Sequence, residues 1–259
     1  MSENQLPFHS KGWNGYVAGP KWKELFLDLD KWLADNPGEL IVRYPCRDVR
    51  KVTTPLGVVY VKDIRALTDA GYYHRDLFSL AKWIFRRSRA VETWNASKTL
   101  IRKGFLCPVP LLAVRRRKGI TPRDVFISAE VPLPNLFDHL PKGMNGTILA
   151  EMLADEIRRL HRSGFAHGDC ILRNVCYDEK NRRIAYLDND RTWLPPAFLR
   201  RHYQCRNLAQ MAYSLLKRFG EASCKHFLEF YSKRAGWPSA AAIKSMHATA
   251  LKRRNKKKK

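Results

Sequence analysis

The stretch that decides the fold is His167-Gly168-Asp169-Cys170-Ile171-Leu172-Arg173-Asn174, which directly follows a segment of helical periodicity. Two short runs with strand character come next, Val175-Cys176-Tyr177 and Ile184-Ala185-Tyr186-Leu187. The second run ends in Asp188-Asn189-Asp190-Arg191, which places Asp188 fourteen residues beyond Asn174. A helix, a polar loop and a hairpin in this order predict that Asp169, Asn174 and Asp188 point into one cleft.

These three side chains match the needs of phosphoryl transfer. The reaction requires a carboxylate that orients or deprotonates the acceptor hydroxyl, and oxygen ligands that hold Mg²⁺ against the phosphates. Asp169 suits the first role, and Asn174 with Asp188 suits the second. A His-Gly-Asp or an Asp-Asn-Asp tripeptide alone is commonly an ordinary turn. Their combination behind a helix favours the catalytic loop and metal loop of a kinase-like enzyme.

Two residues upstream support the same interpretation. Lys62 ends the β-branched run Val58–Val61, where a kinase carries the lysine that pairs with the α- and β-phosphates. Glu92 lies in a later helical segment, where the ion-pair partner of that lysine belongs. Either residue alone is most often a solvated surface charge. Their order relative to Asp169 and Asn174 predicts a site for ATP.

The rest of the chain supplies a strand-rich first half and a helix-rich second half. Helical spacing predicts helices at Trp22–Leu33, from about Leu77 to Lys103 with a division near Ser88, at Ile148–Leu160 and over most of the chain after residue 195. Strands are expected at Leu40–Tyr44, Val58–Val61, Val109–Val114 and Val125–Val131. Gly104 and Gly164 follow two of the helices as C-caps.

This order predicts an α+β protein with a two-lobed, protein-kinase-like fold. The N-lobe is expected to hold a small antiparallel sheet and one major helix, and the C-lobe to be mainly helical. The expected segments are residues 1–37 (an extension with an amphipathic helix), 38–131 (the ATP-binding N-lobe), 132–251 (the catalytic and acceptor-binding C-lobe) and 252–259 (a basic disordered tail).

The charge balance indicates a polyanionic partner. The chain has 48 Lys and Arg against 24 Asp and Glu, a formal net charge of +24, which attracts nucleic acid, an anionic membrane surface or a phosphorylated glycolipid. No run approaches the roughly 20 apolar residues that cross a bilayer, and the N-terminus lacks the pattern of a secretory signal. The six cysteines form no Cys-x-x-Cys pair, so reduced thiols are expected rather than a metal cluster.

With these motifs in place, the chain resembles the lipopolysaccharide kinase family, the Kdo and heptose kinases of the bacterial inner core. The likeness runs from about Arg43 to Leu216. It rests on Val59-Tyr60-Val61-Lys62, Ser88-Arg89-Ala90-Val91-Glu92-Thr93-Trp94, Leu100-Ile101-Arg102-Lys103-Gly104-Phe105, Leu160-His161-Arg162-Ser163-Gly164, the His167–Asn174 loop, Leu187-Asp188-Asn189-Asp190-Arg191 and Arg206-Asn207-Leu208-Ala209.

The resemblance implies an enzyme that uses Mg·ATP to phosphorylate a sugar hydroxyl of nascent lipopolysaccharide. It makes Asp169 the catalytic base, Asn174 and Asp188 the Mg²⁺ ligands, and Lys62 with Glu92 the phosphate-binding pair. The backbone at Glu130 and Val131 becomes the hinge that meets adenine. It also implies a cytoplasmic protein that acts at the cytoplasmic face of the inner membrane.

Several features depart from the kinase pattern or add to it. The chain has no Gly-x-Gly-x-x-Gly loop, and its metal loop reads Asp-Asn-Asp in place of Asp-Phe-Gly. Cys170 is expected to pack within its loop rather than to act in redox chemistry. A peripheral contact with an anionic membrane is expected to involve basic clusters, namely Arg86, Arg87 and Arg89, the run Arg115–Lys118 and the tail from Lys252.

Three other interpretations remain open at this point. A kinase-like enzyme for a small molecule or a protein would use the same residues, although the Ala-Pro-Glu element typical of protein kinases is absent from the sequence. A basic nucleic-acid-binding protein would explain the charge but would not need Asp169, Asn174 and Asp188. A pseudokinase is the least favoured, because Lys62 and those three residues are all present.

Overall fold

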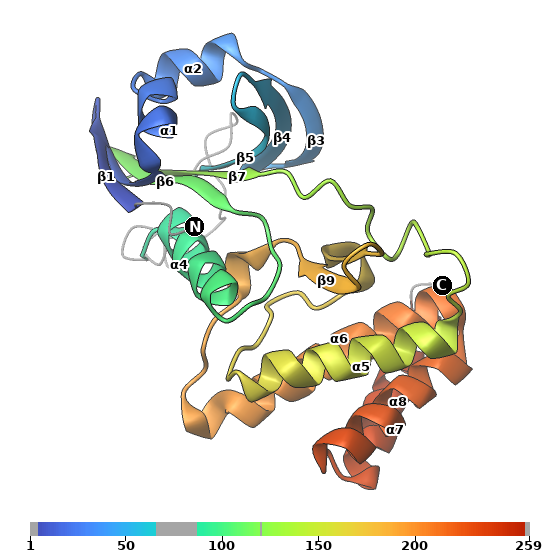
Figure 1. Ribbon diagram of the computed structural model, residues 1–259. Coiled ribbons are helices and arrows are strands. Elements are labelled where there is room, and N and C mark those ends of the chain that lie inside the picture. The colour runs from blue at the N-terminus through green and yellow to red at the C-terminus, as the bar shows by residue number, and fades with distance from the viewer. Residues whose placement is uncertain (1–4, 66–86, 120, 257–259) are drawn as a thin grey trace. The chain divides into compact units, whose positions relative to one another are not determined.

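The computed structural model describes residues 5–65, 87–119 and 121–256. The chain divides into two compact units (Figure 1). Unit 1 comprises Met1–Arg102 and Cys107–Val131, and unit 2 comprises Lys103–Leu106 and Pro132–Lys259. The assignment of Lys103–Leu106 to unit 2 has no counterpart in the sequence analysis.

Unit 1 is built on a seven-stranded sheet in which every neighbouring pair is antiparallel. Its core contains the inward-facing residues of the central strands, including the fully buried Val59, Leu112 and Ile127. The strand order is β1 (Gln5–Ser10), β2 (Trp13–Ala18), β6 (Pro110–Lys118), β7 (Thr121–Ala129), β5 (Gly57–Arg65), β4 (Arg47–Thr54) and β3 (Glu39–Tyr44).

The N-terminal segment is part of this sheet instead of a separate extension. Strands β1 and β2 form a hairpin, and β2 pairs with β6. The single helix expected over Trp22–Leu33 is in fact two, α1 (Gly19–Leu25) and α2 (Leu29–Asp35). Asp28 separates them because its side chain accepts a hydrogen bond from the backbone N–H of Lys31 (3.3 Å) and so caps a new helix.

Helix α4 (Arg89–Arg102) is the major helix of unit 1 and packs against β6 and β7. It begins just after Ser88, where the sequence suggested a division; the preceding part of the expected helix falls within residues 66–86, outside the described residues. Buried Asp124 on β7 fixes this end. It accepts hydrogen bonds from the Arg89 N–H (2.7 Å) and the Ser88 hydroxyl (3.2 Å).

Contacts of Asp124 and Asp30 bear on the basic run Arg115–Lys118, which the sequence analysis expected to contact a membrane. These residues lie within β6, and Arg115 binds Asp124 through Nε at 2.6 Å and Nη2 at 3.0 Å, with its side chain 13% exposed. Arg116 pairs with Asp30 and lies over the ring of buried Trp13. At least these two charges therefore stabilise unit 1 and are not available to a membrane.

Unit 2 is mainly helical, as the sequence predicted, with one small hairpin. Its helices are α5 (Gly146–Arg162), α6 (Ala197–Phe219), α7 (Glu221–Ala235) and α8 (Ala240–Lys256), and its hairpin pairs β8 (Val175–Asp178) with β9 (Arg183–Tyr186). Asn145 caps α5 by accepting from the N–H groups of Thr147 and Ile148, both at 3.0 Å. Because α8 reaches Lys256, helix covers the first residues of the segment expected to be disordered.

Candidate active site

Asp169 and Asn174 lie together in the loop that leaves α5. A single 3₁₀ turn, Leu172–Asn174, folds the chain back so that the side-chain amide of Asn174 returns to Asp169. Its Nδ2 donates to the backbone carbonyl of Asp169 (3.0 Å) and to the carboxylate Oδ2 (3.1 Å). With this spacing of five residues, the side chains of Asp169 and Asn174 lie within hydrogen-bond distance of each other.

Asp188 reaches the same region through the β8–β9 hairpin. Val175 pairs with Tyr186 in the hairpin register, so the residues just outside that pair, Asn174 and Leu187, are neighbours. The Leu187 N–H donates to the Asn174 carbonyl at 2.8 Å. Asp188 follows in the left-handed region, with φ 52° and ψ 63°, at the start of the turn Asn189–Arg191. The fourteen-residue spacing is thus the length of this hairpin.

Buried His167 links the two loops, a role that the sequence analysis did not assign. Its Nδ1 accepts from the N–H of Asp169 (3.2 Å), and its Nε2 donates to the carbonyl of Leu187 (3.1 Å). Burial lowers the pKa of His167, against the opposing charges of Asp188 and Asp169, which favours this neutral ring with one donor and one acceptor. The imidazole therefore holds the Asp169 backbone against the strand that leads to Asp188.

Polar residues on one face of α6 anchor the backbone of the catalytic loop. Asn207 accepts from the His167 N–H (2.9 Å) and donates to the His167 carbonyl, and Gln210 accepts from Cys170 N–H (3.2 Å) and donates to the Gly168 carbonyl (3.3 Å). Ser214, one turn further along α6, accepts from the Leu172 N–H at 3.1 Å. The sequence did contain a signal for this anchoring role, which the sequence analysis missed. The signal is a row of polar residues at helical spacing beside the apolar stripe of α6.

Gly168 is required because the catalytic loop approaches the turn after Asp188 very closely. A Cβ added there would lie 1.8 Å from the Arg191 Cβ and 2.6 Å from the Arg191 Cα and carbonyl carbon. Real Cβ atoms do not approach other heavy atoms so closely, so no larger residue fits without moving one loop. The glycine lets the loops of Asp169 and Asp188 lie against each other.

Cys170 is fully buried in this loop. Burial raises the pKa of its thiol to about 12, and the nearby Asp169 charge acts in the same direction. A thiol held protonated and shielded from solvent is a packing residue, since the thiolate is the reactive form.

The remaining predicted residues lie in unit 1. Lys62 is in the interior of β5, paired with Val49 and Phe126, and does not end the strand as the sequence suggested. Glu92 is in the first turn of α4, the end that Asp124 holds. Each is therefore carried by a rigid element of the same unit.

Glu130 and Val131 end unit 1 just after β7. The Glu130 N–H donates to the Val58 carbonyl (3.0 Å), and its carboxylate pairs with Lys51 (2.8 Å). These contacts fix the peptide that precedes Val131. They also give the Glu130 side chain an ion-pair partner within unit 1.

Oxygen donors of Asn174 and Asp188 could hold one small, hard cation. The two hydrogen bonds of the Asn174 amide to Asp169 use its nitrogen, which leaves Oδ1 as the atom suited to a metal. Magnesium accepts few protein oxygens and keeps several waters, so an amide oxygen and the Asp188 carboxylate suffice. Among the described residues, no group of three or more His, Cys, Asp or Glu side chains forms a metal site of another kind.

A model of the lipopolysaccharide kinase (Kdo/WaaP) family matches residues 74–231, more than half of the 259-residue chain. The chain belongs to the lipopolysaccharide kinase family. A search of the curated proteins found no match. Membership of this family makes the chain a kinase, that is, a phosphotransferase.

Solved structures place this family member among the protein-kinase-like folds, as the sequence predicted. It resembles WaaP in complex with acyl carrier protein, with a TM-score of 0.61 and 17% identity over 89% of this chain and 95% of that chain. It also resembles the Rio2 kinase-ADP/Mg²⁺-phosphoaspartate complex from Chaetomium thermophilum, with a TM-score of 0.52 and 17% identity over 98% of this chain and 82% of that one.

Proposed function

We propose that this lipopolysaccharide kinase family member transfers the γ-phosphoryl group of Mg·ATP to a sugar hydroxyl of the lipopolysaccharide inner core, on Kdo or heptose. The observation that carries the proposal is the Asp169–Asn174 pair, held by His167 beside the strand end that presents Asp188. This arrangement offers one carboxylate to an acceptor and oxygen ligands to a cation, which is the minimum that phosphoryl transfer requires.

Asp169 acts as the catalytic base in this proposal. Its Oδ2 accepts from Asn174 Nδ2, and this bond restricts rotation of the carboxylate. Oδ1 then receives the hydrogen bond of the acceptor hydroxyl and takes its proton as the bond to phosphorus forms. Positioning a hydroxyl in this way contributes more than basicity does, because the transition state of phosphoryl transfer is loose.

The other residues hold the donor. When bound, Mg·ATP supplies the phosphoryl group and the divalent charge that neutralises its oxygens. Asn174 Oδ1 and the Asp188 carboxylate would hold the cation. Lys62 would contact the α- and β-phosphates with Glu92 as its partner, and the Glu130 carbonyl and Val131 N–H would bind the adenine edge.

A peripheral contact with an anionic membrane completes the proposal, since the acceptor is borne by lipid. No helix within the described part of the chain is long and apolar enough to cross a membrane. Support for a peripheral contact comes from the net charge of +24 and from two exposed apolar side chains near Arg200, namely Leu194 (52% exposed) and Phe198 (83% exposed). Apolar side chains beside arginines are typical of surfaces that contact a bilayer interface.

The test is phosphate incorporation into dephosphorylated inner-core lipopolysaccharide with Mg·ATP, followed by mass spectrometry. Asp169→Asn removes the base but keeps the shape, so the rate is expected to fall by about a hundredfold or more while Mg·ATP still binds. Asp138→Asn, an exposed aspartate in another loop of unit 2, is the matched control and keeps the wild-type rate.

The outcomes separate the parts of the proposal. Equal rates for Asp169→Asn and the wild type would remove Asp169 from the catalytic role. Transfer to a small sugar or a protein, with none to lipopolysaccharide, would overturn the acceptor but keep the kinase. A wild-type protein that binds nucleic acid but not Mg·ATP would overturn the donor site as well.

A further inference from the structure

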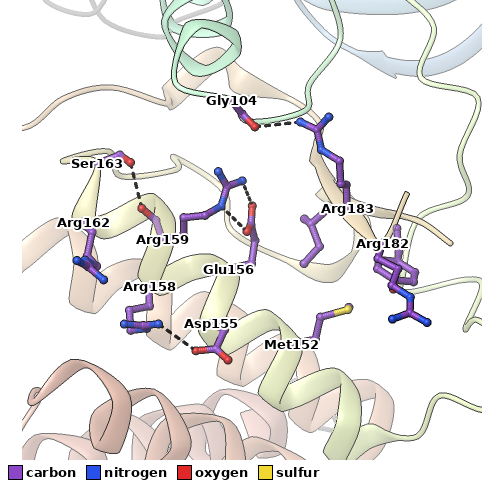
Figure 2. A pocket seen from close by; sticks show the side chains of 12 residues that line it. Gly104, Met152, Asp155, Glu156, Arg158, Arg159, Arg162, Ser163, Arg182 and Arg183 are labelled. Carbon is purple, nitrogen blue, oxygen red and sulfur yellow. Dashed lines mark hydrogen bonds and ion pairs between the residues drawn. The ribbon is translucent and has the colours of Figure 1, made fainter. Parts of the chain in front are cut away.

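Unit 2 contains a second hollow that shares no lining residue with the candidate active site. Its volume is about 1,040 Å³, and it lies between the C-terminal half of α5, the β8–β9 hairpin and Gly104 (Figure 2). Five arginines line it: Arg158, Arg159, Arg162, Arg182 and Arg183. The hollow has the size of a small-ligand pocket, but its lining is far more basic than that of an ordinary apolar pocket.

Two of these arginines are neutralised by the only two carboxylates in the lining, Asp155 and Glu156. Arg159 forms a bidentate pair with Glu156 at 2.8 and 2.7 Å and also lies over the Phe105 ring at 3.8 Å. Arg158 lies 3.4 Å from Asp155, and its Nε is buried without a hydrogen-bond partner among the described residues. A buried donor of this kind normally has a partner, so this atom indicates a ligand or a water in the pocket.

Two of the other three arginines, Arg162 and Arg182, leave a positive charge in the pocket, whereas Arg183 is opposite Asp178 in the hairpin and interacts with its carboxylate. Arg183 donates to the neutral carbonyl of Gly104 (3.0 Å), and no ion pair of Arg162 or Arg182 is seen within the described residues. In Figure 2, Arg162 lies at one end of the pocket and Arg182 at the other. A ligand with separated anionic groups can contact the guanidinium groups at both ends of the pocket.

The hairpin presents Arg182 and Arg183 on a stiff turn. Asp178 accepts hydrogen bonds from the backbone N–H of Asn181 (3.1 Å) and from its side-chain amide (2.7 Å), which closes the turn before the two arginines. A preformed turn loses less conformational entropy when a ligand binds. Arginine also suits phosphate better than lysine does, because its planar fork donates two hydrogen bonds to one anion.

A neighbouring hollow extends the basic surface. It has a volume of about 570 Å³, shares Arg158 and Arg162 with the first, and adds Arg200, Arg201 and Arg234. No carboxylate lines it, although Arg234 Nε lies 4.0 Å from Asp155 Oδ1. The two arginines of α5 therefore lie where two basic hollows meet. This continuity supports a ligand that carries more than one phosphate group.

We propose that the pocket of Figure 2 is a second binding site, distinct from the nucleotide site, for a sugar or lipid headgroup that carries two phosphate groups. Arg162 and Arg182 bind its two phosphates, and Arg158 Nε and Arg183 add further hydrogen bonds. Because the lining includes neither Asp169, Asn174 nor Asp188, this site does not depend on the proposed transfer reaction.

The test is isothermal titration calorimetry with fructose bisphosphate, and with fructose monophosphate as the one-phosphate comparison, in excess Mg·AMP-PNP to fill the nucleotide site. Arg162→Gln/Arg182→Gln removes two side chains outside the ion pairs described above. It is expected to raise the Kd by about tenfold or more, since each hydrogen bond to a charged group contributes over one kcal/mol. Lys21→Gln/Lys23→Gln, which removes two exposed charges from unit 1, keeps the wild-type Kd.

A second arm distinguishes the source of the ligand. Vesicles of phosphatidylcholine with phosphatidic acid compete with fructose bisphosphate if the natural ligand is a lipid headgroup, and do not compete if it is soluble. Equal affinity of Arg162→Gln/Arg182→Gln and the wild type would overturn the proposal, as would no saturable binding to either probe. Equal affinity for the monophosphate and the bisphosphate would overturn the two-phosphate requirement. All of these measurements report binding and not phosphate transfer, so a failure of the kinase proposal would not change how they are interpreted.

Discussion

Gly168 shows how a single residue without a side chain shapes the candidate active site. The backbone of Arg191 occupies the space that a Cβ at position 168 would need. The two loops that carry Asp169 and Asp188 can approach each other only because this atom is missing. If a larger residue at position 168 pushed the two loops apart, the carboxylate of Asp169, of Asp188 or of both would move.

Gly168→Ala is therefore expected to lower the free energy of unfolding by about 1–3 kcal/mol, the usual cost of overpacking. Phosphate transfer should fall further than the loss of folded protein explains. Urea denaturation and the transfer rate measure the two effects. Gly143→Ala is the control for backbone strain without a clash, because an added Cβ there meets nothing within 4 Å although φ is 78°. It should lower stability but leave the transfer rate per folded molecule unchanged. Full activity of Gly168→Ala would show that the loops can separate without consequence.

His161 makes the stability of unit 2 depend on pH. It is 5% exposed, its Nδ1 contacts the Tyr231 hydroxyl at 2.8 Å, and its Nε2 contacts Asn207 Oδ1 at 3.2 Å. Burial lowers the pKa of His161 to about 4, although the hydrogen bond to Asn207 opposes the shift. The folded state thus keeps a neutral ring over a range of pH in which the unfolded chain takes up a proton.

We expect the wild-type protein to lose stability as the pH falls from about 6.5 to about 4, with a contribution from this residue on the order of 3 kcal/mol. The unfolded state binds the extra proton in this window, and below it both states are protonated, so the loss stops. His161→Gln should be less stable at neutral pH but should show a flatter dependence. Chemical denaturation across this range measures it, and an unchanged slope in His161→Gln would contradict the assignment.

At the scale of the element, α6 holds the backbone of the His167–Asn174 loop and also contributes buried residues to the core of unit 2. Asn207 alone satisfies both backbone groups of His167 and contacts the His161 ring. The helix is long enough that Asn207, Gln210 and Ser214 meet successive parts of the loop. The position of Asp169 therefore depends on a helix that begins nearly thirty residues later in the chain.

Asn207→Ala leaves two buried backbone groups and one ring nitrogen without partners. The expected cost is on the order of 3 kcal/mol, because each unsatisfied buried group costs about 1–3 kcal/mol. The exposed neighbour Arg206→Ala should change stability by less than about 0.5 kcal/mol. Thermal denaturation of the two variants gives the comparison, and equal losses would mean that the buried amide has no special role.

At the scale of the whole molecule, the excess of basic residues should govern adsorption to anionic surfaces. The segment after Leu251 holds seven of them, Lys252, Arg253, Arg254 and Lys256–Lys259. Each charge near an anionic membrane contributes about 1 kcal/mol, and salt screens the attraction.

Truncation after Leu251 is therefore expected to reduce binding to vesicles that contain phosphatidylglycerol by at least about tenfold at low salt. Co-sedimentation at increasing salt measures it, with phosphatidylcholine vesicles as the neutral reference. Binding that is insensitive to both salt and truncation would indicate that the apolar residues Leu194 and Phe198 dominate the contact.

Local patterns in the sequence determined much of the architecture. The β-branched runs, the apolar stripe of α5 with its cap at Asn145, and the hairpin after Asn174 each encode a short-range preference, and each appears in the structure. The N-terminal segment was misjudged because β1 and β2 reach stability only by pairing with β6, almost a hundred residues away. A pairing of that separation leaves no periodicity at the local scale.

The sequence by itself determined the order of the polar residues that phosphoryl transfer needs, because a loop and a hairpin of set length bring Asp169, Asn174 and Asp188 together through local hydrogen bonds. Only the tertiary structure decided what holds and surrounds them. Three of these features join residues far apart in the chain. They are the hydrogen bonds of Asn207 to His167, the contact of Arg191 with Gly168, and the arginine pocket between α5 and the β8–β9 hairpin. Such contacts depend on the packing of whole elements, which no local pattern of residues specifies.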